Sequence, residues 1–478
     1  MSPLARVVAV VGCLALLVSG CTRLLAGTPV SVYADPFRVA GLAANDGPSG
    51  LRPDAPAPTR KVLNASGGRE ELIASQAVSD IEDFWTDGYQ PLKGRFQPVT
   101  AAVSWDSASY DGSTFCDNET YELVNAMYCW DNNAIGWDRT QLFPILRSTF
   151  GEMSIPLVLS HEYGHGIQRW AGLANLSTPS LVAEQQADCF AGVYMRWVAE
   201  GKSRRFTVNT GEGLNSVLAT VISTRDPVRT IAGRESDMDE HGSAFERISA
   251  FQMGFTDGPT ACAGIDQNEV KQRRGDLPVA LTRNSTGDWP VSVESVTAVV
   301  EAMNQTFPLV NPPNLTFDTP SAGSCAAATP SPPVSYCPTT NTIAVDLPGL
   351  ADMGTPGGRN RRFALPVGDN TAYSVLVSRY MVALAHQRGV VLDDAAAALR
   401  TACLTGVATT AMSKEITVGS DVVALAAGDL DEAVSGMLTN GLAASDVNGA
   451  SVPSGFSRID AFRAGVLGDQ DRCFKRFP

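Results

Sequence analysis

The chain has 478 residues, of which 44% are hydrophobic and 7% aromatic, and its formal net charge is −14 at pH 7. This length is enough for about two domains, and the apolar content excludes a chain that is mostly disordered. The negative charge argues against the basic surface by which proteins bind nucleic acid, so we expect no nucleic-acid partner.

The N-terminal segment indicates export and a lipid anchor. Arg6 precedes an apolar run from Val7 to Val18 that is too short to span a bilayer comfortably. The run ends in "VSGC", which resembles a bacterial lipobox. We therefore predict that residues 1–20 are a lipoprotein signal peptide and that Cys21 is acylated, which would hold the exported protein at the outer face of the cell membrane. A plain secretory signal with an unrelated cysteine is the alternative.

Residues 21–69 are predicted to be a flexible tether, because they are rich in Ala, Gly, Pro and Ser and show little apolar periodicity. The pattern then becomes regular. Ile81, Phe84 and Trp85 have helical spacing, and "PVTAAVSW" is typical of a strand. These patterns predict an α+β domain over residues 70–265, with a small, mostly antiparallel sheet.

The stretch "IPLVLSHEYGHGIQRW" predicts a helix that carries a metal site. His161 and His165 are four residues apart, so they lie on one face of the helix and can bind one ion. Glu162 stands beside them, where a general base is needed. A core helix whose histidines form internal hydrogen bonds is the alternative.

The next predicted helix, in "AEQQADCFAGV", supplies a third metal ligand. A catalytic zinc needs three protein ligands and an open position for water. We assign Glu184 as the third ligand, and Asp188 as the hydrogen-bond acceptor that orients a ligating imidazole. This set predicts one Zn²⁺ per chain, although other divalent ions are not excluded. His241, in "DEHGSAFER", is the candidate donor to a developing oxyanion, with a helix-capping or surface role as the alternative.

The combination of H-E-x-x-H with a later E-x-x-x-D resembles the gluzincin metallopeptidases. The blocks "EDFWTDGY", "YCWDNNAIGWD", "LSHEYGHGIQ", "EQQADCFAGVYMRW" and "HGSAFERISAFQMGFTDG" are similar to successive blocks of the neutral zinc metallopeptidases. With the lipobox, the chain resembles the lipoprotein peptidases of mycobacteria and their relatives. The resemblance covers about residues 75–262 and implies a zincin-like domain that hydrolyses peptide bonds in peptides or proteins of the cell envelope.

The chain also repeats itself. "YCWDNNAIGWD" matches "YCPTTNTIAVD", "CFAGV" matches "CLTGV", and "RISAFQMGFTDGPTAC" matches "RIDAFRAGVLGDQDRC" without a gap. The matches occur in the same order, which predicts a linker over residues 266–289 and a second copy of the domain over residues 290–478. Chance recurrence in an alanine-rich chain is the alternative.

The second copy lacks the residues of the metal site. Alignment of Ser160 with Ser378, and of the two "C-x-x-G-V" motifs, replaces the two histidines, Glu162, Glu184 and Asp188 by other residues. In that order, the replacing residues are Arg379, Ala383, Tyr380, Ala398 and Ala402. The copy is therefore expected to be catalytically inactive, and its isolated His386 to be structural or exposed.

The repeat also selects a disulfide pattern. An even number of cysteines in an exported chain indicates disulfides, and equivalent cysteines should pair equivalently. The simplest pairing that satisfies this condition is Cys116–Cys129, Cys189–Cys262, Cys325–Cys337 and Cys403–Cys473.

The function expected from these residues is that of a cell-envelope lipoprotein zinc metallopeptidase, which uses a zinc-bound water and Glu162 as the general base. A binding or scaffold lipoprotein with a structural metal site is the alternative, but such a site has four protein ligands and needs no base. In a third hypothesis the inactive copy recruits the substrate.

A substrate chain would add to a sheet edge. "AMYCWDNNAIGWD" is a candidate for that edge, although an ordinary internal strand is the preferred interpretation.

Overall fold

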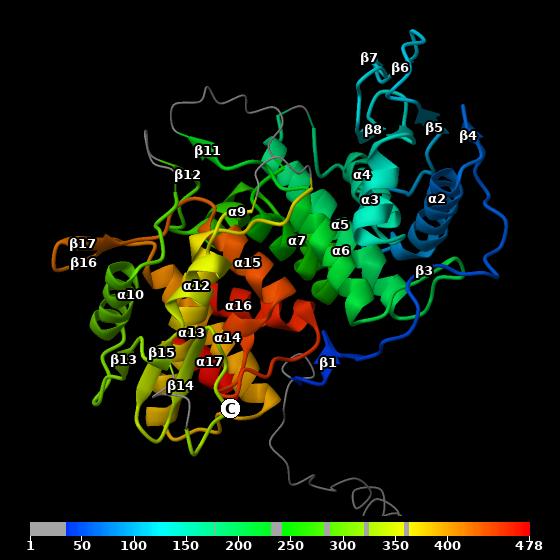
Figure 1. Cartoon of the computed structure of the whole chain (residues 1–478). Coiled ribbons are helices and arrows are strands. Elements are labelled where there is room, and N and C mark those ends of the chain that lie inside the picture. The colour runs from blue at the N-terminus through cyan, green and yellow to red at the C-terminus, as the bar shows by residue number, and fades with distance from the viewer. Residues whose placement is uncertain (1–34, 176, 231–240, 282–286, 320–324, 358–362) are drawn as a thin grey trace, which may run out of the picture.

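A computed structural model describes residues 35–478 except 176, 231–240, 282–286, 320–324 and 358–362. The predicted signal peptide and Cys21 lie outside the described residues. Helices and small sheets alternate along the chain, which confirms the α+β class (Figure 1). Within the described ranges, no helix is both long and apolar enough to cross a membrane.

The main sheet of the N-terminal half contains β4 (Val62–Leu63), β5 (Ala101–Trp105), β9 (Ala134–Asp138) and β8 (Ala126–Cys129), in that spatial order. Only the β8–β9 pair is antiparallel, so the expectation of a mostly antiparallel sheet is wrong. α2 (Arg69–Gly88) is the crossover that makes β4 and β5 parallel, whereas β5 and β9 are parallel because β8 enters the sheet between them in the chain and pairs antiparallel with β9. The stretch "AMYCWDNNAIGWD" forms both β8, which ends the sheet, and β9, which is an internal strand.

Three helices pack together beside this sheet and position the candidate site. They are α4 (Ser154–Ala171), α5 (Ser180–Ala199) and α7 (Ala244–Asp257); α5 lies between the other two. A Cβ on Gly254 would collide with the carbonyl oxygen of Cys189 in α5. Glycine at this position therefore allows the close approach of α5 and α7.

The other elements of the N-terminal half are short strands and flanking helices. They are β1 (Arg38–Val39), β2 (Leu42–Ala43), β3 (Gly50–Leu51), β6 (Thr114–Phe115), β7 (Asn118–Glu119), α3 (Leu142–Phe150), β10 (Phe206–Thr207), α6 (Glu212–Ser223), β11 (Arg229–Thr230) and α8 (Pro259–Ala263). β1 to β4 lie in the segment expected to be a tether, and β4 joins the main sheet. Strands of two residues carry no periodicity, so the sequence gives no signal for them.

The segment expected to be a linker contains α9 (Gln267–Arg274) and β12 (Ala280–Leu281), which pairs in parallel with β11. The C-terminal half then follows with its own helices and small sheets. Its elements are α10 (Val293–Thr306), β13 (Asn314–Thr316), β14 (Val334–Cys337), β15 (Thr342–Val345), α12 (Leu347–Met353), α13 (Asp369–Gln387), α14 (Ala395–Ala411), β16 (Ile416–Val418), β17 (Asp421–Val423), α15 (Asp429–Thr439), a 3₁₀ helix (Leu442–Ala444), α16 (Gly455–Val466) and α17 (Gln470–Arg476).

Several local features occur in both halves. β15 pairs in parallel with β13 and antiparallel with β14, just as β9 pairs with β5 and β8. The Tyr128 hydroxyl donates to Asn133 at 2.9 Å, and the Tyr336 hydroxyl donates to Asn341 at 2.9 Å. Both asparagines have positive φ, 49° for Asn133 and 47° for Asn341. The two β-hairpins therefore share their register, their turn and the hydrogen bond that closes the turn.

The four predicted disulfides are present. They are Cys116–Cys129, Cys189–Cys262, Cys325–Cys337 and Cys403–Cys473. Cys189–Cys262 links α5 to α8, and Cys403–Cys473 links α14 to α17. Each half thus contains one bridge that closes a short loop and one that joins two helices.

The two halves pack against each other through one continuous hydrophobic core. Phe255 of α7 lies against Phe456 of α16, with 4.8 Å between their ring centroids. Asp431 of α15 is buried, and its Oδ1 accepts a hydrogen bond from the backbone N–H of Phe245 at 3.1 Å. The start of α7, which bears part of the candidate site, is therefore held by the C-terminal half.

Carboxylates gather where α13 and α15 begin. Oxygen atoms of Asp288, Asp369 and Glu432 lie within 4.8 Å of one another. Burial, together with the neighbouring charge of Asp369, raises the pKa of Glu432 to about 8. Burial raises the pKa of Asp369 to about 6. In the folded state these two carboxyl groups keep their protons at pH values at which the unfolded chain has already released them. The free energy of unfolding therefore falls as the pH rises from the unfolded pKa of a glutamate to about 8.

We predict that Glu432→Gln raises the melting temperature at about pH 8 and has little effect near pH 5, where the glutamate is already protonated in the folded state. One such proton contributes at most about 1.4 kcal/mol of unfolding free energy per pH unit. Thermal unfolding across this pH range measures the effect, with the exposed Glu415→Gln as the control. An equal loss of stability at both pH values would contradict the prediction.

Candidate metal centre

The helix α4 places the two histidines and the glutamate of the H-E-x-x-H motif. Pro156 lies in the first turn of this helix, where its missing N–H leaves no hydrogen bond unmade. Gly172 ends it with a left-handed φ of 67°. The imidazole rings of His161 and His165 are on one face, with 5.2 Å between their centroids.

Glu184 of α5 faces both histidines. Its Oε2 lies 3.1 Å from Nε2 of His161, and its Oε1 lies 3.5 Å from Nε2 of His165. One ligand atom from each of these three residues lies within 4.8 Å of the others. Two imidazole nitrogens and a carboxylate are a ligand set that zinc prefers, and three protein ligands leave a fourth position open. The structure thus brings the three predicted ligands together.

Asp188 lies behind His161, on the side away from Glu184. Its Oδ1 is 2.8 Å from Nδ1 of His161, so the proton of the neutral imidazole belongs on Nδ1 and the lone pair of Nε2 faces Glu184. Arg247 of α7 donates to both oxygens of Asp188, at 2.9 Å from Nε and 2.7 Å from Nη2. Gln168 orients the second imidazole, with its Oε1 3.1 Å from Nδ1 of His165. Sequence reasoning missed both Arg247 and Gln168 as parts of the site.

The electrostatics of this cluster favour a cation. Burial by itself would lower the pKa of His161, but Asp188 and Glu184 outweigh it and raise that pKa to about 10. Burial would raise the pKa of Glu184, but the positive charges of His165 and His161 outweigh it and lower that pKa. The negative charges of Asp188 and Glu184 stabilise a proton on His161, and the same charges would stabilise a divalent ion bound between these side chains.

Glu162 lies outside this ligand group. Its Oε2 accepts a hydrogen bond from the backbone N–H of Tyr128 in β8 at 2.9 Å. Burial raises the pKa of Glu162, and the charges of His161 and His165 partly offset that effect. The carboxylate lines a cavity next to the metal ligands, where a base can reach a bound substrate.

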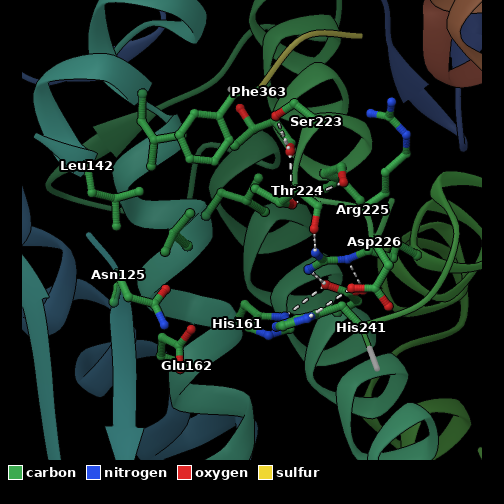
Figure 2. A pocket seen from close by; sticks show the side chains of 18 of the residues that line it. Asn125, Leu142, His161, Glu162, Ser223, Thr224, Arg225, Asp226, His241 and Phe363 are labelled. Carbon is green, nitrogen blue, oxygen red and sulfur yellow. Dashed lines mark hydrogen bonds and ion pairs between the residues drawn. The ribbon is translucent and has the colours of Figure 1, made fainter. Parts of the chain in front are cut away.

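This cavity has a volume of about 510 Å³ and contains a polar end and an apolar end. Figure 2 shows His161, Glu162 and His241 at the lower end of the view, and Leu142 and Phe363 at the upper end. A cavity of this size and mixed lining is typical of a site that binds an organic molecule or part of a peptide.

His241 lies at the polar end and faces the same oxygen of Glu184 as His161 does. Its Nε2 is 3.7 Å from Oε2 of Glu184, and its Nδ1 is 3.4 Å from Oδ1 of Asp226. The hydrogen bond with Asp226 raises the pKa of His241. Its side chain is 45% exposed, so it can reach a molecule in the cavity. No sequence motif marked Asp226, because its role depends on a loop that meets the site only in the folded chain.

The corresponding positions of the C-terminal half contain no such ligands. Arg379 is buried, and its guanidinium donates to the carbonyl oxygens of Leu442, Ser445 and Asp446. His386 lies 2.8 Å from the Tyr336 hydroxyl, which agrees with the expected structural role. Among the described residues, the other group of clustered metal-binding side chains consists of carboxylates alone.

A comparison with protein families matches residues 34–265 to the model described as "Putative neutral zinc metallopeptidase". This segment belongs to that family. The matched segment contains α4, α5 and α7, as well as Asp226 and His241.

Curated relatives of this chain are uncharacterized proteins of Mycobacterium bovis and Mycobacterium tuberculosis. They are 28% identical over 160 residues, which cover 29% of this chain and 54% of each relative. The chain thus spans about half the length of the curated relatives that it matches. No solved structure matches it.

We predict that Asp188→Asn weakens zinc binding by about 10- to 100-fold, because it removes the charge that orients His161 and leaves Arg247 without its carboxylate. Competition with a chromogenic chelator measures the zinc dissociation constant. Glu200→Gln, at the exposed end of the same helix, is the matched control. An unchanged zinc affinity in Asp188→Asn would show that the imidazole is oriented without this carboxylate.

Proposed function

We propose that this protein is a zinc metallopeptidase of the cell envelope that cleaves peptide bonds within its substrates. The observation that carries the proposal is the grouping of His161, His165 and Glu184, with Glu162 beside them and outside the ligand group. Zinc, when bound by these three side chains, supplies Lewis-acid chemistry that activates a water molecule and polarises the carbonyl of the substrate.

Glu162 is the base in this mechanism. Its carboxylate takes a proton from the attacking water and then delivers it to the nitrogen of the leaving amine. The backbone N–H of Tyr128 holds one oxygen of Glu162 at 2.9 Å, which keeps the carboxylate at the cavity. His241, positioned by Asp226, donates a hydrogen bond to the oxyanion that develops as the water attacks.

The substrate binds as an additional strand along β8. The N–H of Tyr128 points to Glu162 and thus away from β9. In an antiparallel pair, outward-pointing backbone groups recur at every second residue, so the backbone of Ala126 also faces outward. An extended peptide that pairs with Ala126 would run past Glu162 with its carbonyls near the metal ligands.

The alternative function is that of a non-catalytic binding or scaffold lipoprotein with a structural metal. Glu162 is the feature that favours catalysis, because a structural site would use it as a ligand or would not need it. A closed structural site needs neither a carboxylate held by the backbone N–H of Tyr128 nor a carboxylate that lines an open cavity, and Glu162 is both.

We also propose that the C-terminal half is a duplicated, inactive peptidase domain. The common order of elements, the shared hairpin geometry and the equivalent disulfides support this origin. Gly465 of α16 meets the carbonyl of Cys403 as closely as Gly254 of α7 meets that of Cys189. Arg379 replaces His161 in the alignment, and a buried guanidinium that is already bonded to carbonyl oxygens would repel a metal ion.

We predict that the wild-type protein binds one zinc ion per chain, that Glu162→Gln keeps this ion and loses peptidase activity, and that His165→Ala loses both. The loss of the base removes both proton transfers, and each is commonly worth a factor of about 10²–10⁴. Metal analysis and cleavage of a fluorogenic peptide library measure the two properties. Glu119→Gln, in the exposed strand β7, is the control. Full activity in Glu162→Gln would refute the mechanism.

Export and lipid anchoring are part of the proposal, and they rest on the sequence "VSGC". We predict that the protein fractionates with membranes and that Cys21→Ser releases it, because the thiol that would carry the lipid is gone. Mass spectrometry of the N-terminal peptide from the membrane fraction identifies the modification. An N-terminal peptide that begins at another residue and carries no lipid would rule out acylation at Cys21.

A further inference from the structure

The C-terminal half contributes to the wall of the peptidase cavity. Phe363 and Ala364, which precede α13, line the cavity together with residues of α3, α4 and α6. In Figure 2, Phe363 lies at the end of the cavity opposite Glu162. The cavity is thus built from two segments that lie far apart in the sequence.

Arg225 holds this segment in place. Its Nη1 donates to the carbonyl oxygen of Ala364 at 3.1 Å, and its Nε lies 3.8 Å from Oδ2 of Asp431. Arg225 itself lines the cavity and follows α6 in the N-terminal half. One guanidinium therefore connects the peptidase segment to two separate parts of the C-terminal half.

The end of the cavity beside Phe363 is apolar. The larger aliphatic side chains that line the cavity are Val124, Leu142, Leu146, Leu157, Val158 and Val221. Leu142, Leu146 and Leu157 are at most 5% exposed, so they form a fixed wall. Such a wall favours a large apolar side chain, because each Å² of apolar surface removed from water contributes about 25 cal/mol.

We propose that Phe363 and Ala364 complete a subsite for a large apolar side chain of the peptide substrate. The C-terminal half then helps to select the bond that the N-terminal half cuts, although its described residues contain no counterpart of the His161, His165 and Glu184 group. This inference rests on the proposed peptidase function, and it adds the substrate class and the residues that select it.

Phe363→Ala is the variant that tests the subsite. Phe363 has a φ of 65°, a conformation that is unfavourable for any residue with a Cβ. Alanine also has a Cβ, so the substitution removes the aromatic ring but leaves the backbone strain unchanged. Val367→Ala is the matched control, because Val367 follows in the same segment, is 38% exposed and does not line the cavity. Phe363→Leu restores a large apolar side chain.

The first measurement is the kcat/KM of the zinc-loaded full chain for peptides that differ only in the residue next to the cleaved bond. We expect the wild type to prefer leucine or phenylalanine to alanine at one of the two sides. Phe363→Ala should lower kcat/KM for the preferred peptide by about tenfold, which corresponds to the loss of roughly 50 Å² of apolar contact, and should leave the alanine peptide nearly unchanged. Phe363→Leu should recover most of the preference.

The second measurement is calorimetric binding of the same peptides to zinc-loaded Glu162→Gln, with and without Phe363→Ala, and it needs no cleavage. A selective loss of affinity for the large apolar peptide supports the subsite. If Glu162→Gln binds these peptides selectively, if Phe363→Ala removes that selectivity, and if the wild type cleaves none of them, the peptidase function fails and the subsite stands. If Phe363→Ala changes all peptides equally, or changes none, the proposed subsite is overturned whether or not the protein cleaves peptides.

Discussion

The salt bridge between Asp188 and Arg247 is the interaction on which the candidate site depends. Asp188 lies on α5, accepts from Arg247 of α7 and contacts His161 of α4, so one buried carboxylate joins the three helices that build the site. Removal of one partner from a buried ion pair commonly costs about 3–5 kcal/mol, because the remaining charge is left uncompensated. The geometry of the metal ligands is therefore tied to the packing of the helices.

The C-terminal half shows that this packing does not need the ion pair. Ala402 aligns with Asp188, and Arg458 aligns with Arg247. Arg458 donates instead to the backbone carbonyls of Met437, Leu438, Val452 and Pro453, so its charge is satisfied without a carboxylate. The close glycine contacts and the disulfide Cys403–Cys473 remain. Under the proposed duplication, the second half has kept the packing of the helices and lost the chemistry.

Much of the site could be predicted because its ligands follow helical spacing. His161 and His165 are separated by four residues, as are Glu184 and Asp188, so each pair must share a face of its own helix. Asp226 and Phe363 lie in loops, and no local pattern indicates which surface a loop will meet. The strand directions and the two-residue strands of residues 38–63 were missed for the same reason, since they depend on tertiary partners.

The proposed mechanism requires that His161, His165 and Glu184 hold a zinc ion with one open position beside Glu162. X-ray absorption spectroscopy of the zinc-loaded full chain tests it most directly. We expect two imidazole nitrogens at about 2.0–2.1 Å and carboxylate or water oxygens at about 2.0–2.2 Å. His165→Ala should reduce the imidazole contribution to one ring, if metal is retained at all. A spectrum with sulfur ligands, or one that is unchanged in His165→Ala, would show that these three side chains do not hold the ion.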